Sequence, residues 1–132
     1  LNKELVPVHS LKSVIAQIIN CNKGESVGYN RSFFCENDMK VGVIPIGHAD
    51  GISRLFSKNA HVFISDKKAE VLGNICMDVL MINLNGVNCD EGDEVVVFDS
   101  KNNAEDFAKS VGTISYEILT NLSARIERKI IR

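Results

Sequence analysis

The sequence has 132 residues, of which 45% are hydrophobic and 24% are charged. This is the composition of an ordinary globular domain, and it excludes a disordered tail, a collagen-like chain and a coiled coil. The 15 Lys and Arg residues against 17 Asp and Glu residues leave a net charge of −2, which indicates neither nucleic acid nor a membrane as a partner. No apolar run reaches the roughly 18 residues of a membrane-spanning helix.

The chain is long enough for one domain with its own core, and no linker divides it. Its first residues match neither a signal peptide nor a transit peptide, and they contain no Met. We therefore expect residues 1–132 to be a single domain cut from a longer polypeptide.

The four cysteines are far apart in the sequence, with no C-x-x-C pair and no neighbouring histidine that would suggest zinc. Such unpaired cysteines favour a reducing, cytoplasmic compartment, and we predict no metal site. The four are Cys21, Cys35, Cys76 and Cys89.

Taken in chain order, the first part of the sequence predicts strands. The runs are of strand length, apolar and rich in Val and Ile. They are residues 11–19, 40–46, 60–64, 68–72, 77–84 and 94–98, and the tail 125–131 returns to the same pattern. Ser65-Asp66 lies between two of these runs and predicts the tip of a hairpin.

Two late segments predict short helices. Residues 102–112 begin with Asn102 and Asn103, either of which can cap a helix, and end with Gly112 at the position of a C′ glycine. Residues 115–121 predict a second helix, with Thr113 as its N-cap. So many strands with two late helices favour a mainly β fold, a closed or nearly closed β-barrel, because closure removes exposed strand edges. A sandwich remains possible on periodicity alone.

These patterns by themselves identify no chemistry. The sequence contains no phosphate-binding glycine loop and no G-x-S-x-G motif. The three histidines lie in different segments, and an isolated histidine is more often a surface residue than a catalyst. Tyr29 and Tyr116 are more often packing residues than catalysts, and Cys76-Met77-Asp78 reads equally well as core residues followed by a turn.

Four segments resemble the C-terminal domain of alanine racemase, in content and in order along nearly the whole chain. They are residues 23–29 (KGESVGY), 44–51 (IPIGHADG, followed by Arg54), 71–78 (VLGNICMD) and 112–117 (GTISYE), and residues 123–128 (SARIER) close the series. Any one of these matches is weak, whereas four in order are specific.

The resemblance implies a second domain and a cofactor that this chain does not carry. Enzymes of this family have an N-terminal (β/α)₈ barrel in which pyridoxal 5′-phosphate is attached to a lysine. They form head-to-tail homodimers in which the C-terminal β-domain reaches the cofactor of the other subunit. The cofactor lysine is therefore expected outside this chain, and the chain alone is expected to be inactive.

The resemblance also implies roles for individual residues. Tyr29 matches the base that takes the α-proton of the L-isomer, while the cofactor lysine serves the D-isomer. Met77 matches a residue whose backbone N–H binds the substrate carboxylate, and the adjoining Asp78 is expected to support that turn. Tyr116 matches a tyrosine whose hydroxyl contacts the cofactor phosphate. Four further positions match the lining of the substrate access corridor: His48, Arg54, Asn74 and Ile114.

The sequence departs from the family pattern at three positions. His48 replaces a tyrosine that is usual there, Asn74 replaces an arginine, and Glu127 replaces a proline. The implied function is that of a cytoplasmic enzyme domain that interconverts L- and D-alanine for peptidoglycan synthesis. A racemase of another small amino acid, such as serine, and a non-catalytic β-module for dimerisation or partner binding are the alternatives.

Overall fold

The computed structural model describes residues 5–57 and 59–131. Within these residues the chain forms nine strands, two α-helices and two short 3₁₀ helices. The strands are β1 (Leu11–Val14), β2 (Gln17–Cys21), β3 (Ser26–Val27), β4 (Phe33–Phe34), β5 (Met39–Ile44), β6 (His61–Ile64), β7 (Lys67–Leu72), β8 (Leu80–Asn83) and β9 (Glu94–Phe98). The helices are η1 (His48–Asp50), η2 (Arg54–Ser57), α1 (Ala104–Ser110) and α2 (Ser115–Asn121).

Seven of the strands form one antiparallel sheet in the order β1-β9-β6-β7-β8-β5-β2. Its two edges, β1 and β2, follow one another in the chain, so the strand predicted over residues 11–19 is in fact two strands. The chain changes partner between them, because the Ile15 N–H donates to the Asp93 carbonyl (3.0 Å) and the Ala16 N–H donates to the Val43 carbonyl (2.9 Å).

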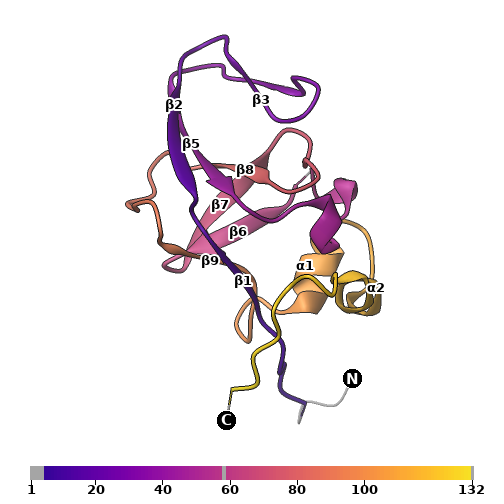
Figure 1. Cartoon of the computed structure of the whole chain (residues 1–132). Coiled ribbons are helices and arrows are strands. Elements are labelled where there is room, and N and C mark those ends of the chain that lie inside the picture. Colours follow the sequence, from indigo (N-terminus) through magenta and orange to yellow (C-terminus); the bar gives the residue numbers. More distant parts are fainter. Residues whose placement is uncertain (1–4, 58, 132) are drawn as a thin grey trace.

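The sheet curls into a half-barrel that stays open, since β1 and β2 are not paired with each other (Figure 1). The expectation of a closed or nearly closed barrel is therefore wrong. The mainly β fold with two short helices late in the chain is confirmed.

Local turn chemistry gives the most accurate predictions. Ser65 and Asp66 both have positive φ, 47° and 64°, and they join β6 to β7 as the two central residues of a hairpin turn. The Asn103 side chain accepts hydrogen bonds from the N–H groups of Glu105 and Asp106, and so caps α1. Gly112 follows α1 with φ 78°, the left-handed conformation that glycine adopts most easily.

Two predicted element starts are corrected. Thr113 does not cap α2: its hydroxyl donates to the Glu117 carboxylate, and Ile114 occupies the N-cap without a side-chain bond. The strand predicted over residues 77–84 begins only at β8, because the Cys76 N–H donates to the Val79 carbonyl (3.0 Å) and makes a turn.

The tail 125–131 is not a strand. The Arg128 guanidinium donates to the carbonyl oxygens of Leu122 (3.0 Å) and Ile126 (2.7 Å). The Arg128 side chain thus supplies the hydrogen bonds that these two carbonyl groups would receive from a neighbouring strand in a sheet.

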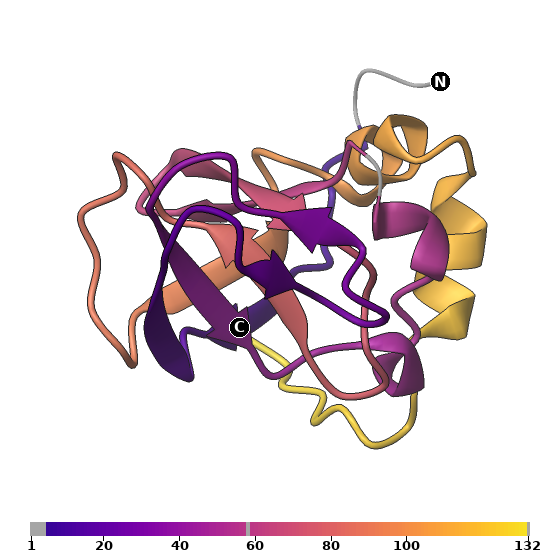
Figure 2. The same cartoon turned by 90° about the horizontal axis from the view of Figure 1, so that it is seen from above.

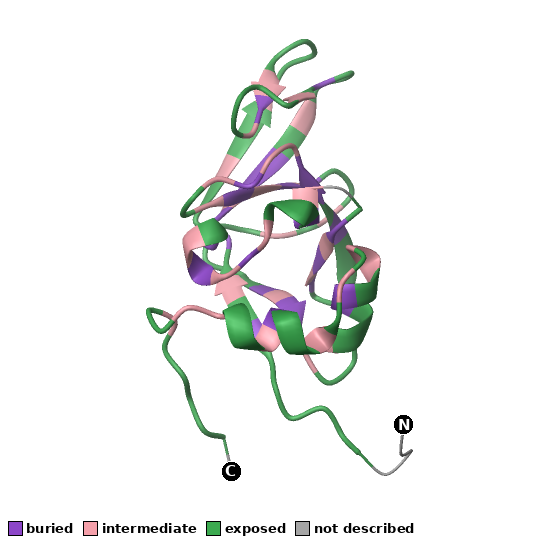
Figure 3. Ribbon diagram, turned by 90° about the vertical axis from the view of Figure 1, so that its right-hand side faces the viewer, coloured by how far each residue is buried: buried purple, intermediate pink, exposed green. Residues whose placement is uncertain are grey.

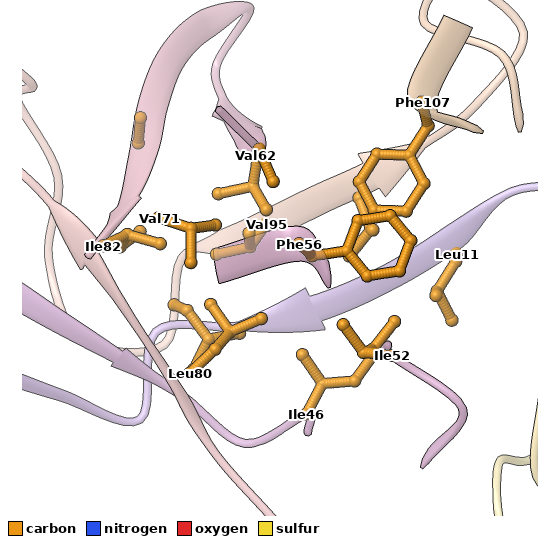
Figure 4. Close-up of a cluster of buried hydrophobic side chains, with 14 of the residues drawn as sticks. Leu11, Ile46, Ile52, Phe56, Val62, Val71, Leu80, Ile82, Val95 and Phe107 are labelled. Carbon is orange, nitrogen blue, oxygen red and sulfur yellow. The ribbon is translucent and has the colours of Figure 1, made fainter. Parts of the chain in front are cut away.

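The main hydrophobic core lies between the concave face of the sheet and the helices. Residues of β6 and β8 alternate between buried and half-buried positions, as expected for strands with one face on a core. Phe56 of η2 stacks on Phe107 of α1 with ring centroids 4.5 Å apart (Figure 4). Phe107 also contacts Phe98 of β9. These aromatic contacts fix η2 and α1 to one side of the curled sheet, where Figure 2 shows the two helices together.

The other end of the molecule is an arm made of β2, β5 and the β3–β4 ribbon (Figure 1). A small second core supports it, formed by Val27, Cys35, Val41 and Leu72. The outer surface of the arm is largely exposed (Figure 3). The loop between β3 and β4, which contains Tyr29, contacts the rest of the fold at Asn74 in the β7–β8 loop.

Candidate functional site

Three segments meet where the arm joins the sheet, and together they are called the loop surface below. They are the β3–β4 loop (28–32), η1 and the β7–β8 loop (73–79). The first and last of these touch at Tyr29, whose N–H donates to the Asn74 carbonyl at 3.4 Å, while the Asn74 amide donates to the Tyr29 carbonyl at 3.3 Å. The structure thus places Tyr29 beside Asn74, which is 45 residues away in the chain.

Two glycines permit this contact. A Cβ on Gly28 would lie 3.0 Å from the Asn74 nitrogen, and a Cβ on Gly73 would lie 2.8 Å from the Val27 carbonyl oxygen. Both glycines also have positive φ, 82° and 64°. Larger residues here would separate the two loops and move the Tyr29 main chain.

The Tyr29 side chain is left in solvent. It is 62% exposed, and its hydroxyl has no hydrogen-bond partner in residues 5–57 and 59–131. A buried packing role is therefore excluded for Tyr29 within this chain. The Tyr29 main chain is held by hydrogen bonds while its phenol is unpartnered among the described residues, which suits a side chain that acts on a molecule outside the domain.

The turn around Met77 is held by η1. The His48 N–H donates to the Cys76 carbonyl (2.9 Å), and the Ala49 N–H donates to the Met77 carbonyl (2.8 Å). This approach requires Gly47, because a Cβ there would lie 2.5 Å from the Cys76 oxygen. The Met77 N–H finds no acceptor within the described part of the chain, and the Met77 side chain is 59% exposed.

Asp50, Asp78 and Arg125 form an ion-pair cluster that the sequence did not predict. Asp50 is buried, and the Arg125 guanidinium donates to its two oxygens through Nε (2.6 Å) and Nη2 (3.0 Å). The same Nη2 lies 2.8 Å from Asp78 Oδ1. The Gly47 N–H also donates to Asp50.

These contacts shift the protonation equilibria of the cluster. The hydrogen bond from Arg125 holds the pKa of Asp50 below its ordinary value of 3.8, with a further contribution from the Gly47 N–H, against the opposing effect of burial. The pKa of Arg125 is raised, first by Asp50 and then by Asp78, so this guanidinium remains charged. The sequence offered only the Asp50-Gly51 turn pattern, which gives no sign of a partner 75 residues away.

Because the folded chain lowers the pKa of Asp50, this group stabilises the fold above pH 3.8 and ceases to do so as the pH falls through its lowered pKa. Asp50→Asn is expected to lower the free energy of unfolding at neutral pH by roughly 1.5–3 kcal/mol, the range for a hydrogen bond to a charged group. Denaturant unfolding between about pH 7 and pH 2 measures this, and the difference between wild type and variant should shrink at the acidic end. A difference that is constant with pH would exclude the ionised carboxylate as its source.

Among the described residues, no hydrogen bond joins the remaining predicted residues to Tyr29 or Met77. Arg54 is exposed on η2, whose Ser57 hydroxyl accepts from the Ile75 N–H. Tyr116 is 73% exposed in the first turn of α2, and Ile114, just before it, is 63% exposed. The His48 ring forms one hydrogen bond among the described residues, with the Ile52 carbonyl (3.3 Å), and the hydrogen bond from His48 to the β7–β8 loop comes from its main chain.

Other kinds of site were sought in the same residues. Residues 5–57 and 59–131 contain no group of three His, Cys, Asp or Glu side chains placed to hold a metal ion. All four cysteines are free thiols. No helix among the described residues is long and apolar enough to cross a membrane.

Fold and site together define a class of protein: a curled β-domain whose loops expose a tyrosine and a main-chain N–H that has no acceptor among the described residues. The family model described as "Alanine racemase, C-terminal domain" matches residues 8–130. The chain is 39% identical over 125 residues to the alanine racemase of Helicobacter pylori strain G27, and covers 33% of that protein while the match covers 92% of this chain. The chain therefore belongs to the family of alanine racemase C-terminal domains.

Solved structures agree with this assignment. The alanine racemase of Clostridium difficile 630 in complex with cycloserine superposes with a TM-score of 0.86 at 36% identity, over 93% of this chain and 33% of that one. The alanine racemase of Bartonella henselae with covalently bound pyridoxal phosphate gives a TM-score of 0.88 at 28% identity, over 92% and 34%. The chain thus spans about a third of the length of the relatives it matches.

Proposed function

We propose that this chain is the C-terminal domain of a pyridoxal phosphate-dependent racemase that interconverts L- and D-alanine for peptidoglycan synthesis in the cytoplasm. In this proposal the rest of the enzyme is an N-terminal barrel domain, and two copies of the enzyme associate head to tail. The observation that carries the proposal is the pairing of an exposed Tyr29 with an unengaged Met77 N–H on one loop surface.

The residues of the loop surface fit part of a cofactor site and not the whole of it. Exposed hydroxyls and a free N–H are suitable donors to an anionic substrate and a phosphate, whereas the lysine that holds pyridoxal phosphate is proposed to lie outside this chain. The Bartonella henselae relative contains covalently bound pyridoxal phosphate, which supports the same cofactor here. When bound, this cofactor withdraws electrons from the α-carbon and so makes its proton removable.

Racemisation needs one group on each face of the α-carbon. Tyr29 is the group on the L-face in this proposal: its phenolate takes the α-proton from L-alanine, and its phenol returns a proton when the reaction runs in reverse. A tyrosine with an ordinary pKa near 10 is a weak base at neutral pH, so cationic neighbours must favour the phenolate. The barrel domain is proposed to supply them.

The other predicted residues receive the remaining roles. The Met77 N–H binds the substrate carboxylate, and Asp78 supports its turn. The Tyr116 hydroxyl contacts the cofactor phosphate, which its exposed position at the start of α2 permits. Four residues line the access corridor of the substrate: His48, Arg54, Asn74 and Ile114.

The test is chiral analysis of the product formed from L-alanine by the full-length polypeptide that contains this domain, purified with pyridoxal phosphate. We expect D-alanine, and less product from L-serine at equal concentration. If the enzyme binds the cofactor and converts serine but not alanine, the proposed substrate changes from alanine to serine. Absence of cofactor binding would favour a non-catalytic module for dimerisation or partner binding.

A further inference from the structure

The direction of the Met77 N–H is set by the peptide group that joins Cys76 to Met77. This group is trans and planar, so its C=O and N–H point in opposite directions. Its carbonyl receives the His48 N–H at 2.9 Å and therefore faces η1. The Met77 N–H must then point away from η1, toward the open side of the loop surface.

This orientation depends on how firmly η1 and the β7–β8 loop are joined. Two main-chain hydrogen bonds from η1 join them, and one side chain adds a third connection. Arg125 donates hydrogen bonds from Nε and Nη2 to Asp50 at the end of η1. Its Nη2 also forms an ion pair with Asp78, the residue after Met77. The tail that carries Arg125 is itself fastened to η1, since the Ser123 N–H donates to the Asp50 carbonyl at 3.0 Å.

An arginine suits this task for a physical reason. Its planar guanidinium holds several donors in a fixed fork, so contacts with two carboxylates also fix the distance between the segments that carry them. A lysine ammonium is a point charge on a flexible stem, and would hold one carboxylate without fixing the second. One of the two carboxylates here is buried and the other exposed, so the fork spans from the core side of η1 to the rim of the loop surface.

We propose that Arg125 is a positioning residue for substrate binding: by joining Asp50 to Asp78 it holds the Met77 N–H in the orientation that receives the carboxylate of the amino acid. Arg125 does not touch the substrate in this arrangement. The proposal rests on the proposed function, because it takes the Met77 N–H as the carboxylate donor.

The kinetic test uses Arg125→Met in the full-length enzyme, with alanine as substrate and propionate as a competitive inhibitor. Propionate has the carboxylate and methyl group of alanine without the amino group, so its inhibition constant reports carboxylate binding. We expect the KM for alanine and the inhibition constant for propionate to rise together, on the order of 10-fold. Both constants are independent of the concentration of folded enzyme. If Arg125 only stabilises the fold, the substitution lowers the amount of active enzyme and leaves both constants unchanged.

Two further variants complete this test. Arg125→Lys should recover part of the loss, and Asp78→Asn, at an exposed position, should raise both constants in the same direction. Arg128→Met is the matched control, because Arg128 lies on the same tail but donates to main-chain carbonyls. Constants for Arg125→Met within twofold of wild type, or an equal rise in Arg128→Met, would overturn the proposal.

A measurement that needs no activity separates this proposal from the proposed function. Amide hydrogen exchange should be faster in Arg125→Met than in wild type at His48 and Ala49, whose N–H groups join η1 to the β7–β8 loop. An inactive wild-type enzyme would overturn the proposed function. Unchanged exchange at these two amides would overturn the positioning role whatever the activity.

Discussion

Tyr29→Phe in the full-length enzyme is expected to reduce the interconversion of L- and D-alanine by more than about 10²-fold, the lower range for a positioned acid–base group. The substitution removes one oxygen atom from a side chain that is 62% exposed. The main-chain hydrogen bonds between Tyr29 and Asn74 remain, because they involve no atom of the phenol.

The fold should therefore be unaffected, with a change in unfolding free energy within about 0.5 kcal/mol, as for other surface substitutions. Cofactor content, measured by absorbance, should also match wild type. This contrast between lost turnover and retained structure distinguishes a reacting group from a packing group.

Isotope exchange gives the sharper readout for the same variant. In deuterated water the group on the opposite face should still remove and return the α-hydrogen of D-alanine. Tyr29→Phe should thus incorporate deuterium into D-alanine while forming little L-alanine. Racemisation at the wild-type rate, or exchange lost equally from both isomers, would exclude Tyr29 as the base for the L-face.

The sequence predicted elements well where the signal is local. The strand over residues 94–98 and the helix over residues 115–121 match β9 and α2 in both boundaries. The hairpin tip at Ser65-Asp66 and the Asn103 cap are likewise confirmed, since each depends on the backbone preferences of one or two residues.

The predictions that were wrong concern strands that depend on contacts between residues far apart in the sequence. The strand over residues 11–19 breaks because Ile15 and Ala16 pair with different partners, at Asp93 and Val43. The tail was expected to pair as a strand, but its Arg125 side chain donates a hydrogen bond to Asp50, 75 positions away. A single sequence contains no record of such pairings.

The candidate site shows the same division. Tyr29, Met77 and Tyr116 were singled out by resemblance, and their roles stay predictions. The structure adds that the main chain around Tyr29 and Met77 is held by close approaches at glycines and by η1, which motif matching does not reveal. Asp50 and Arg125 lay inside matched segments, yet their cooperation with Asp78 became apparent only from geometry.

Gly51→Ala is expected to be among the most destabilising small substitutions in the chain. Gly51 ends η1 with φ 99°, a conformation that costs a residue with a Cβ roughly 1–2 kcal/mol. A Cβ there would also lie 2.6 Å from the carbonyl carbon of Asn121 and 3.0 Å from the Leu122 Cα, both main-chain atoms at the end of α2. Neither segment can yield by rotating a side chain.

The total loss should be about 2–5 kcal/mol, because the backbone strain adds to the roughly 1–3 kcal/mol that overpacking costs. That is a large share of the roughly 5–15 kcal/mol by which domains are stable. Urea denaturation measures it, with Gly86→Ala as the matched control, since Gly86 also has positive φ (76°) but nothing within 4 Å of an added Cβ. The control isolates backbone strain, and the excess in Gly51→Ala measures how tightly α2 is packed on η1; equal losses in the two variants would show that this packing yields without cost.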